Sequence, residues 1–188
     1  MKVKIISLLQ HEKILIRKAA TGRREAQKVL YERYAPRMLS LCRRYVKDPH
    51  FAEDVMIEGF VKVFSRLRDF EFRGSFEGWI RRIMVREAID FLRKRQFMVY
   101  DDLQLETYQV EQQLSDPYQL EALEHLIEKL PEGYRLVFTL YAIEGYKHAE
   151  IAALLDISES TSKSQLYKAR KQLQEQLKET SKRQYGTH

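Results

Sequence analysis

Apolar side chains recur every three or four positions along most of the chain, a spacing that places them on one face of an α-helix. Only 7 Gly and 4 Pro interrupt the pattern in 188 residues. We therefore expect an all-α protein with helices over residues 11–20, 25–46, 51–67, 75–95 and 120–130, and a further helix that Pro131 opens at its first position. Pro36 should kink the second helix or mark a join.

The most informative pattern lies in residues 144–173, where two short helical patterns flank a break at residues 156–158. The apolar positions are Ile151, Leu154, Leu155, Leu166, Ala169, Leu173 and Leu177. This arrangement predicts a helix-turn-helix. Ser158 is expected to be the N-cap of its second helix, because its hydroxyl can accept from the free amides of the first turn.

Placing the apolar face of that second helix inward turns hydroxyl and cationic side chains outward. These are Ser160, Thr161, Ser164, Lys168 and Lys171, with Lys163 and Gln165 on the flanks. Such a face can hold phosphates and reach base edges in a major groove, which indicates duplex DNA binding. An ordinary solvated face rich in lysine is the alternative.

The charge distribution divides the chain into two basic modules. The net charge is +6, yet residues 96–128 contain eight acidic residues and no Lys or Arg. Removing those eight from the total of 27 leaves 19 acidic residues against 33 basic ones elsewhere. We expect two small helical domains joined by a flexible acidic linker, which tends to stay extended because its like charges repel one another. A plain solvated linker is the alternative.

No pattern of a catalytic site is present, because the sequence has no glycine-rich phosphate loop, no paired-histidine zinc signature and no nucleophile elbow. We therefore expect no enzyme, no metal and no cofactor. The single Cys42 excludes an internal disulfide and is typical of a reducing compartment. No stretch approaches the ~18 apolar residues of a membrane span, so we expect a cytoplasmic protein without membrane insertion.

Aromatic and basic residues gather between residues 51 and 95. The aromatic ones are Phe51, Phe60, Phe64, Phe70, Phe72, Phe76 and Trp79, and Arg81, Arg82, Arg86, Arg93, Lys94 and Arg95 follow directly. This combination suits unpaired nucleic acid, in which bases stack on rings and cations hold phosphates. Phe60, Phe64 and Trp79 have core spacing. Phe70 and Phe72, in an expected loop over residues 68–74, are better candidates for base contact.

Four stretches resemble the extracytoplasmic-function (ECF, group IV) sigma factors of bacteria, in the order found in that family. They are AEDVMIEGFVKVF at residues 52–64, FRGSFEGWIRRIMVREAIDFLRK at 72–94, LPEGYRLVFTLYAIEGYKHAEIAALLDIS at 130–158 and STSKSQLYKARKQL at 160–173. The resemblance implies sigma region 2 over residues 1–97, an acidic linker over 98–118, region 4 as a winged-helix-like four-helix domain over 119–180, and a tail over 181–188.

The resemblance also implies partners and site residues. Core RNA polymerase, through the clamp helices of its largest subunit, and promoter DNA would be partners, and an anti-sigma factor is left open as a further one. Residues of three interfaces carry over: polymerase-binding Asp54, Glu58 and Lys62; minus-ten-binding Phe70, Phe72, Arg82, Ile83, Arg86 and Arg93; and minus-thirty-five-binding Ser160, Thr161, Lys163, Ser164, Lys168, Arg170 and Lys171. Among these, Phe70, Ile83 and Arg86 would line a pocket for a base that leaves the stack.

Three positions depart from the pattern of the family. Ile57 stands where a Gln is usual, Ser162 replaces an apolar residue, and Gln165 replaces an Arg.

Two other classes of protein share parts of the pattern. A free-standing helix-turn-helix regulator would need a dimerisation surface or a ligand pocket, and an anti-sigma antagonist would not need two basic modules.

Overall fold

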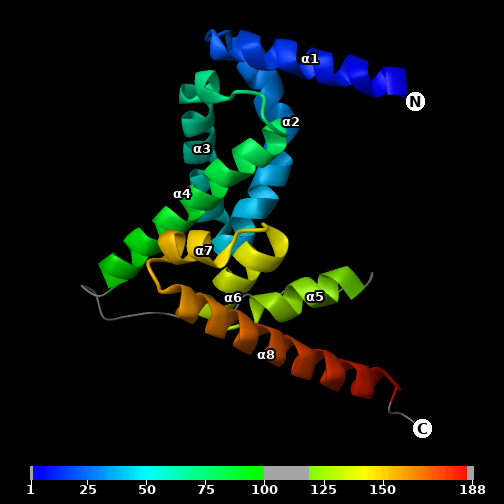
Figure 1. Ribbon diagram of the computed structural model, residues 1–188, viewed down its shortest axis with the longest axis vertical. Coiled ribbons are helices and arrows are strands. Elements are labelled where there is room, and N and C mark those ends of the chain that lie inside the picture. The colour runs from blue at the N-terminus through cyan, green and yellow to red at the C-terminus, as the bar shows by residue number, and fades with distance from the viewer. Residues whose placement is uncertain (1, 100–118, 186–188) are drawn as a thin grey trace. The chain divides into compact units, whose positions relative to one another are not determined.

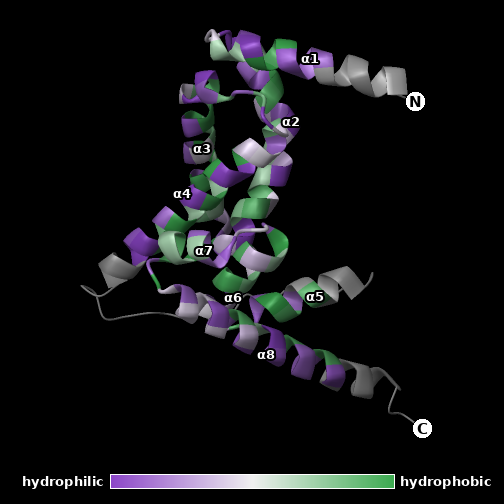
Figure 2. Cartoon of the chain, in the orientation of Figure 1, coloured by the Kyte–Doolittle hydropathy of each residue, from purple (hydrophilic) through white to green (hydrophobic). Residues whose placement is uncertain are grey.

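The structure is a computed structural model that describes residues 2–99 and 119–185. These residues divide into two compact units, unit 1 (Met1–Gln104) and unit 2 (Leu105–His188), which are described separately. No strand occurs in the described ranges, and the all-α fold is confirmed (Figure 1). Hydrophobic and hydrophilic residues alternate around the helices, as expected for amphipathic elements (Figure 2). No helix in the described part is long and apolar enough to cross a membrane.

Unit 1 contains helices α1 (Lys2–Ala20), α2 (Arg24–Tyr45), α3 (Pro49–Ser65) and α4 (Phe76–Val99), with a short 3-10 turn, η1 (Leu67–Asp69), after α3. Helices α2, α3 and α4 pack against one another, and α1 packs on α2 and η1. The core includes apolar side chains that recur at helical spacing: Leu30, Tyr34, Met38, Leu41, Tyr45, Met56, Phe60, Val63, Ile80, Met84 and Ile89.

The expected boundaries of unit 1 need three corrections. Helix α1 begins at Lys2, well before residue 11, and α3 ends at Ser65, so that Leu67 belongs to the 3-10 turn. Helix α2 runs without a join through Pro36. Pro36 is exposed, where water can bond to the carbonyl that lacks an amide partner. Val29, which precedes the buried Leu30 in α2 and is also apolar, is exposed.

Helices α3 and α4 approach each other closely at Gly59. A Cβ atom at this position would lie 2.9 Å from Cε of Met84 and closer still to its Sδ. Near the same crossing, Lys62 of α3 donates to Glu87 of α4, with Nζ 2.6 Å from Oε1. Glu87 is 8% exposed and Lys62 about half exposed. The lack of a side chain at Gly59 thus permits the close approach of α3 to α4, and the Lys62–Glu87 ion pair links the two helices beside it.

Unit 2 contains α5 (Gln119–Glu128), α6 (Glu132–Phe138), a π-helical turn η2 (Thr139–Ile143), α7 (His148–Leu155) and α8 (Glu159–Tyr185). Its core includes Ile127, Leu130, Val137, Leu140, Ile151, Leu166, Ala169 and Leu173. Pro131 is the N-cap of α6 and precedes its first helical position. Leu177, expected on the apolar face of α8, is exposed. The four helices carry no wing in the described range, because a wing would require strands.

The helix-turn-helix consists of α7 and α8. Asp156 ends α7 in the left-handed conformation, with φ 55° and ψ 48°, which reverses the chain within three residues. Ser158 then accepts a hydrogen bond from the amide of Thr161 at 3.0 Å, so the expected N-cap is confirmed. Of the expected acidic linker, residues 98 and 99 still belong to α4, and residues 100–118 lie outside the described range.

Candidate nucleic-acid interface

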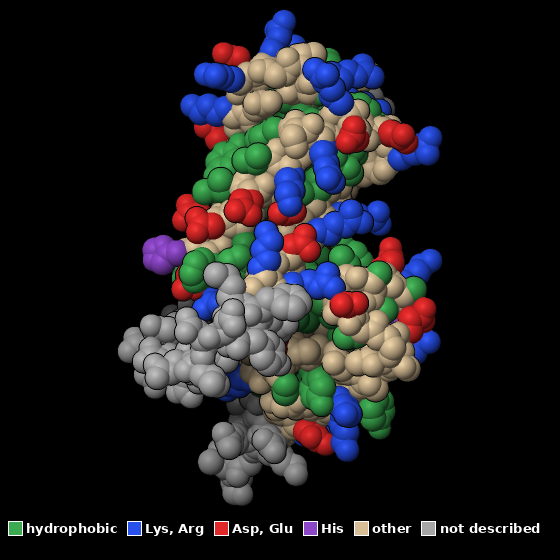
Figure 3. All heavy atoms as spheres, turned by 90° about the vertical axis from the view of Figure 1, so that its left-hand side faces the viewer, with side chains coloured by type: hydrophobic (Ala, Val, Ile, Leu, Met, Phe, Trp, Pro, Cys, Tyr) green, Lys and Arg blue, Asp and Glu red, His purple; other side chains and the backbone are tan. Residues whose placement is uncertain are grey.

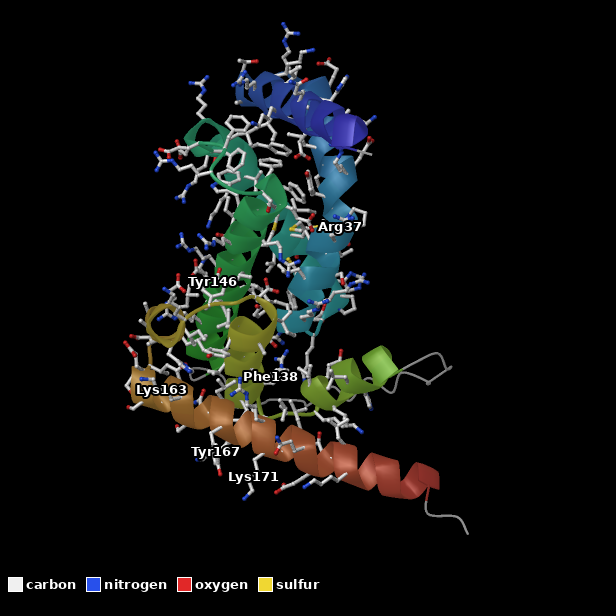
Figure 4. All side chains as sticks on the ribbon, turned by 45° about the vertical axis from the view of Figure 1, so that its right-hand side comes forward. Arg37, Phe138, Tyr146, Lys163, Tyr167 and Lys171 are labelled. Atoms are coloured by element: carbon white, nitrogen blue, oxygen red, sulfur yellow. The ribbon has the colours of Figure 1, made fainter. Side chains whose placement is uncertain are left out.

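The outward side of α8 is a polar stripe with one large aromatic residue. Ser160, Ser164, Tyr167 and Lys171 follow one another at steps of four, three and four, which places them on one face. All four are exposed, and Tyr167 is the most exposed large hydrophobic residue described, at 70%. Tyr167 and Lys171 project from the same side of α8 (Figure 4). We call these four residues the recognition face. Tyr167 was not among the expected site residues, although its spacing from Ser164 and Lys171 indicates the same face.

Two of the cations beside the recognition face lie over tyrosine rings. Nζ of Lys168 lies 6.0 Å from the ring centre of Tyr134 in α6, and Cζ of Arg170 lies 5.5 Å from that of Tyr141 in η2. Lys168 and Arg170 lie on opposite flanks of α8 because they are 200° apart around the helix. Lys163 pairs with Glu159 one turn earlier, with Nζ 3.5 Å from Oε2. Thr161 is half-buried. The positive charge therefore borders the face on both sides.

Ser162 lies on the inward side of α8 and is fully buried. Its hydroxyl forms a hydrogen bond of 2.9 Å with Nδ1 of His148 in α7, and the His148 ring stacks on Tyr141 at 4.7 Å. This contact satisfies a polar group that burial would otherwise destabilise. A serine at this position, where the family has an apolar residue, is thus explained by a partner across the helix-turn-helix.

The outward side of α3 combines carboxylates with aliphatic side chains. Asp54 and Glu58 are exposed, and beside them on the same side of the helix lie Ile57, 45% exposed, and Val61, 64% exposed. We call these four residues the α3 stripe. Lys62 does not belong to it, because it lies on the flank that faces α4, where it pairs with Glu87. The sequence analysis did not identify Ile57 and Val61 as site residues.

The aromatic loop, residues 70–75, joins η1 to α4. Phe70 is only 6% exposed and contacts Phe72, Phe76 and Trp79 at centroid distances of 4.9, 5.1 and 5.4 Å. Phe70 therefore packs in an aromatic cluster and presents no open ring face in this state. Ser75 caps α4, because its hydroxyl accepts a hydrogen bond from the amide of Gly78 at 3.0 Å.

Phe72 covers this cluster in an unusual conformation. Its φ is +60°, and such a left-handed backbone costs a non-glycine residue roughly 1–2 kcal/mol. Two cations of α1 lie over its ring: Cζ of Arg17 at 5.5 Å and Nζ of Lys13 at 6.0 Å from the centroid. Each such contact stabilises by about 0.5–1 kcal/mol at an exposed site. Nε of Arg68 donates a hydrogen bond to the Ala20 carbonyl at 3.2 Å. Helix α1 therefore contacts the segment between α3 and α4 at both Arg68 and Phe72.

The exposed side of α4 continues from this cluster. Arg82 and Arg86 are exposed, whereas Ile83 and Arg93 are half-buried. Arg82, Arg86 and Arg93 share one face by helical spacing, and Trp79 borders it. The space-filling view shows Lys and Arg side chains, with a few carboxylates among them, over the end of unit 1 that holds the α1–α2 turn and the loop (Figure 3). Unit 1 thus carries exposed cations at this end, besides the exposed carboxylates and aliphatic side chains of α3.

A polar hollow of about 360 Å³ lies between α1, α2 and the start of α4. Its charged groups pair with one another. Arg37 lies 2.8 Å from Glu77, and Arg33 lies 3.4 Å from Glu12, which also accepts from the hydroxyl of Tyr34. Burial and the neighbouring Glu12 carboxylate raise the pKa of Tyr34 well above its usual value. These pairs join three helices, and the hollow is a structural junction.

Comparison with known proteins explains the two units. Residues 30–98 match Sigma-70 region 2, and residues 120–173 match Sigma-70, region 4. The chain is 30% identical over 173 residues to the ECF RNA polymerase sigma-E factor of Escherichia coli (strain K12), an alignment that covers 85% of this chain and 90% of that protein. The chain belongs to the ECF sigma factors. Sigma factors direct promoter-specific initiation of transcription, and this sigma factor therefore acts in that step.

Other relatives agree with this assignment. The ECF RNA polymerase sigma factor SigE of Mycolicibacterium smegmatis is 30% identical over 155 residues, which cover 79% of this sigma factor and 60% of that protein. Among solved structures, sigma factor RpoE in complex with the anti-sigma factor NepR, from Bartonella quintana, has a TM-score of 0.57 at 22% identity, covering 80% of this chain and 96% of that one. CnrH in complex with the cytosolic domain of CnrY has a TM-score of 0.51 at 25% identity, covering 89% and 97%.

Proposed function

We propose that this sigma factor docks on core RNA polymerase through α3, opens and reads the minus-ten element with the aromatic loop and α4, and reads the minus-thirty-five element with α8. The observation that carries this proposal is the separation of surfaces. A carboxylate and aliphatic stripe lies on α3, a basic and aromatic surface on α4, and a hydroxyl, tyrosine and lysine face on α8. Each surface suits one of three partners: a protein, unpaired DNA and duplex DNA.

Reconstituted transcription tests the proposal as a whole. Core polymerase and this protein are incubated with a library of random upstream sequences, and the start sites are mapped. We expect initiation only from templates with two elements at a fixed spacing. A free-standing helix-turn-helix regulator, the alternative function, would give no initiation unless a second sigma factor were added.

For polymerase docking, the α3 stripe is the proposed contact, and Lys62 contributes by holding α3 on α4. Carboxylates can pair with cations of a clamp helix while Ile57 and Val61 are buried against it. We expect Asp54→Lys with Glu58→Lys to weaken binding to core polymerase by about tenfold or more. The matched control reverses Glu25 and Glu32 on α2, and should bind normally. Unchanged affinity in a folded α3 variant would remove this helix from the interface.

For the minus-ten element, Phe70, Trp79, Ile83 and Arg86 surround the proposed site for an unstacked base, with Phe72, Arg82 and Arg93 beside it. Because Phe70 is buried, Phe70→Leu is the sharpest change, since it keeps apolar volume and removes the ring. We expect this variant to lose permanganate-sensitive melting while duplex binding by α8 survives. Arg86→Ala should change the preferred base, whereas Arg82→Ala should weaken opening on all sequences alike. Normal melting by Phe70→Leu would exclude its ring.

For the minus-thirty-five element, the recognition face is proposed to contact bases, with Lys163, Lys168 and Arg170 on phosphates at its borders. Tyr167 at the centre can place its ring against a thymine methyl group and its hydroxyl on a base edge. Tyr167→Ala should relax preference at one position by ~1–3 kcal/mol. Lys168→Ala should lower affinity evenly, because Lys168 is drawn towards Tyr134. Equal losses on all sequences in both variants would contradict the central place of Tyr167.

An anti-sigma factor is a proposed further partner, and the cytoplasm, where polymerase acts, the proposed location. Support comes from the solved relatives, since CnrH is bound to the cytosolic domain of CnrY and RpoE to the anti-sigma factor NepR. Pull-down with the purified protein from its native host, followed by competition with core polymerase, tests this partner. Capture of a protein that core polymerase does not displace would contradict anti-sigma action.

A further inference from the structure

Both rings of the aromatic loop pack against other side chains in this structure. Phe70 is buried in the cluster with Phe76 and Trp79, and Phe72 lies against it at a centroid distance of 4.9 Å. Arg17 and Lys13 of α1 lie over the Phe72 ring, at 5.5 and 6.0 Å from its centroid. Phe72 therefore links the buried Phe70 to the two cations of α1.

Two opposing contributions act on Phe72 and are similar in size. The left-handed backbone at φ +60° favours a return to an extended conformation. The two cation contacts favour the closed position. Gly74, at φ +99° with no atom within 4 Å of a Cβ built on it, gives the following backbone room to turn. A segment held closed by a small net difference can open when the cation contacts are removed.

Arg17 and Lys13 are also placed to bind phosphate. Both side chains are exposed, they lie one helical turn apart on α1, and neither forms an ion pair with a carboxylate in the described part of the chain. A phosphodiester backbone is the partner that such a pair attracts most strongly. A phosphate that draws the two cations away removes what holds the Phe72 ring.

We propose that Lys13 and Arg17 are positioning residues of the minus-ten machinery, which hold Phe72 over Phe70 in the free protein and release it when they bind phosphates of the unpaired strand. This inference rests on the proposed function, since it takes the aromatic cluster as the place where a base is received. It assigns α1 a part in promoter opening and couples the opening of the pocket to the presence of the strand. Phe72 becomes a cover for the pocket.

Trp79 permits a direct test, because it is the only tryptophan of the chain and contacts Phe70 within the cluster. Acrylamide quenching of Trp79 fluorescence in the full chain reports whether the cover is closed. Lys13→Gln with Arg17→Gln should shift the ratio of closed to open states by on the order of tenfold and raise quenching. Lys18→Gln with Arg23→Gln removes two charges elsewhere near the α1–α2 turn and should leave quenching unchanged.

Two further arms complete the test. Phe72→Gly keeps the left-handed backbone without strain and removes the ring, so it should be folded and should quench like the Lys13 and Arg17 double variant. A single-stranded oligothymidylate should raise quenching in the wild type and leave it unchanged in both open variants. Wild-type quenching in both open variants would overturn the proposal. These measurements need no promoter melting, so a failure here is distinct from a failure of the permanganate experiment.

Discussion

Replacement of Lys62 separates two roles for this residue, contact with polymerase and attachment of α3 to α4. Lys62 Nζ lies 2.6 Å from Oε1 of Glu87, which is 8% exposed. At an effective dielectric constant of ~20, the gross attraction at such a distance is about 4–6 kcal/mol. Desolvation of Glu87 and solvent screening of the half-exposed Lys62 reduce the net contribution to about 1–2 kcal/mol. We expect Lys62→Met to lower the free energy of unfolding by at least that amount, because it also leaves a carboxylate buried without its cation.

The double variant Lys62→Met with Glu87→Leu decides between the two roles. Removing both charges in favour of apolar groups of similar shape should restore most of the stability, as measured by urea denaturation followed by circular dichroism. If Lys62 acts only within unit 1, this double variant should bind core polymerase with the affinity of the wild type. Restored stability with lost polymerase binding would refute that reasoning and return Lys62 to the interface. Stability unchanged by Lys62→Met alone would show that the ion pair contributes nothing.

Three other changes test separate parts of the structure. Gly59→Ala should lower the free energy of unfolding by about 1 kcal/mol, because the clash with Met84 exceeds the gain in helix propensity. Met84→Ala in the same chain should relieve the clash. A Gly59→Ala variant with a higher melting temperature than the wild type would contradict the close crossing. Ser158→Ala should cost about 1 kcal/mol and weaken duplex binding, whereas Ser158→Asp should keep the cap; equal melting temperatures would exclude its capping role. Burial raises the pKa of the Cys42 thiol to about 12, so little thiolate is present below that pH. Ellman's reagent should therefore react with Cys42 at pH 8 only after the protein is unfolded. Rapid reaction with the folded protein would show that the thiol is exposed.

Features that depend on neighbours in the chain could be predicted from the sequence. The Ser158 cap and the inward positions of Leu166, Ala169 and Leu173 follow from helical spacing and local hydrogen bonding. Tyr167 was within reach of the same argument, since it lies three residues after Ser164. The predicted face contained only cations, hydroxyls and Gln165, whereas Tyr167 is the most exposed large hydrophobic residue in the described part of the chain.

Features that depend on distant residues could not be predicted in this way. Lys62 and Glu87 are 25 positions apart, and nothing in the spacing of either helix indicates that they meet. The burial of Phe70 depends on Phe76 and Trp79, and the position of Phe72 depends on two residues of α1. Packing between helices decides which members of an aromatic and basic group remain accessible.

The contact at Gly59 has a mechanical consequence. The backbone of α3 at Gly59 lies directly against the Met84 side chain of α4, without room for an added methyl group. Sliding of one helix along the other would therefore disrupt close packing and cost free energy. A tilt imposed on α3 from outside is therefore carried to α4 at the same angle, and the aromatic loop that joins them travels along. Docking of α3 on polymerase would then orient α4 and the aromatic loop towards the DNA without changing the packing inside unit 1. Only the cover at Phe72 would move on its own.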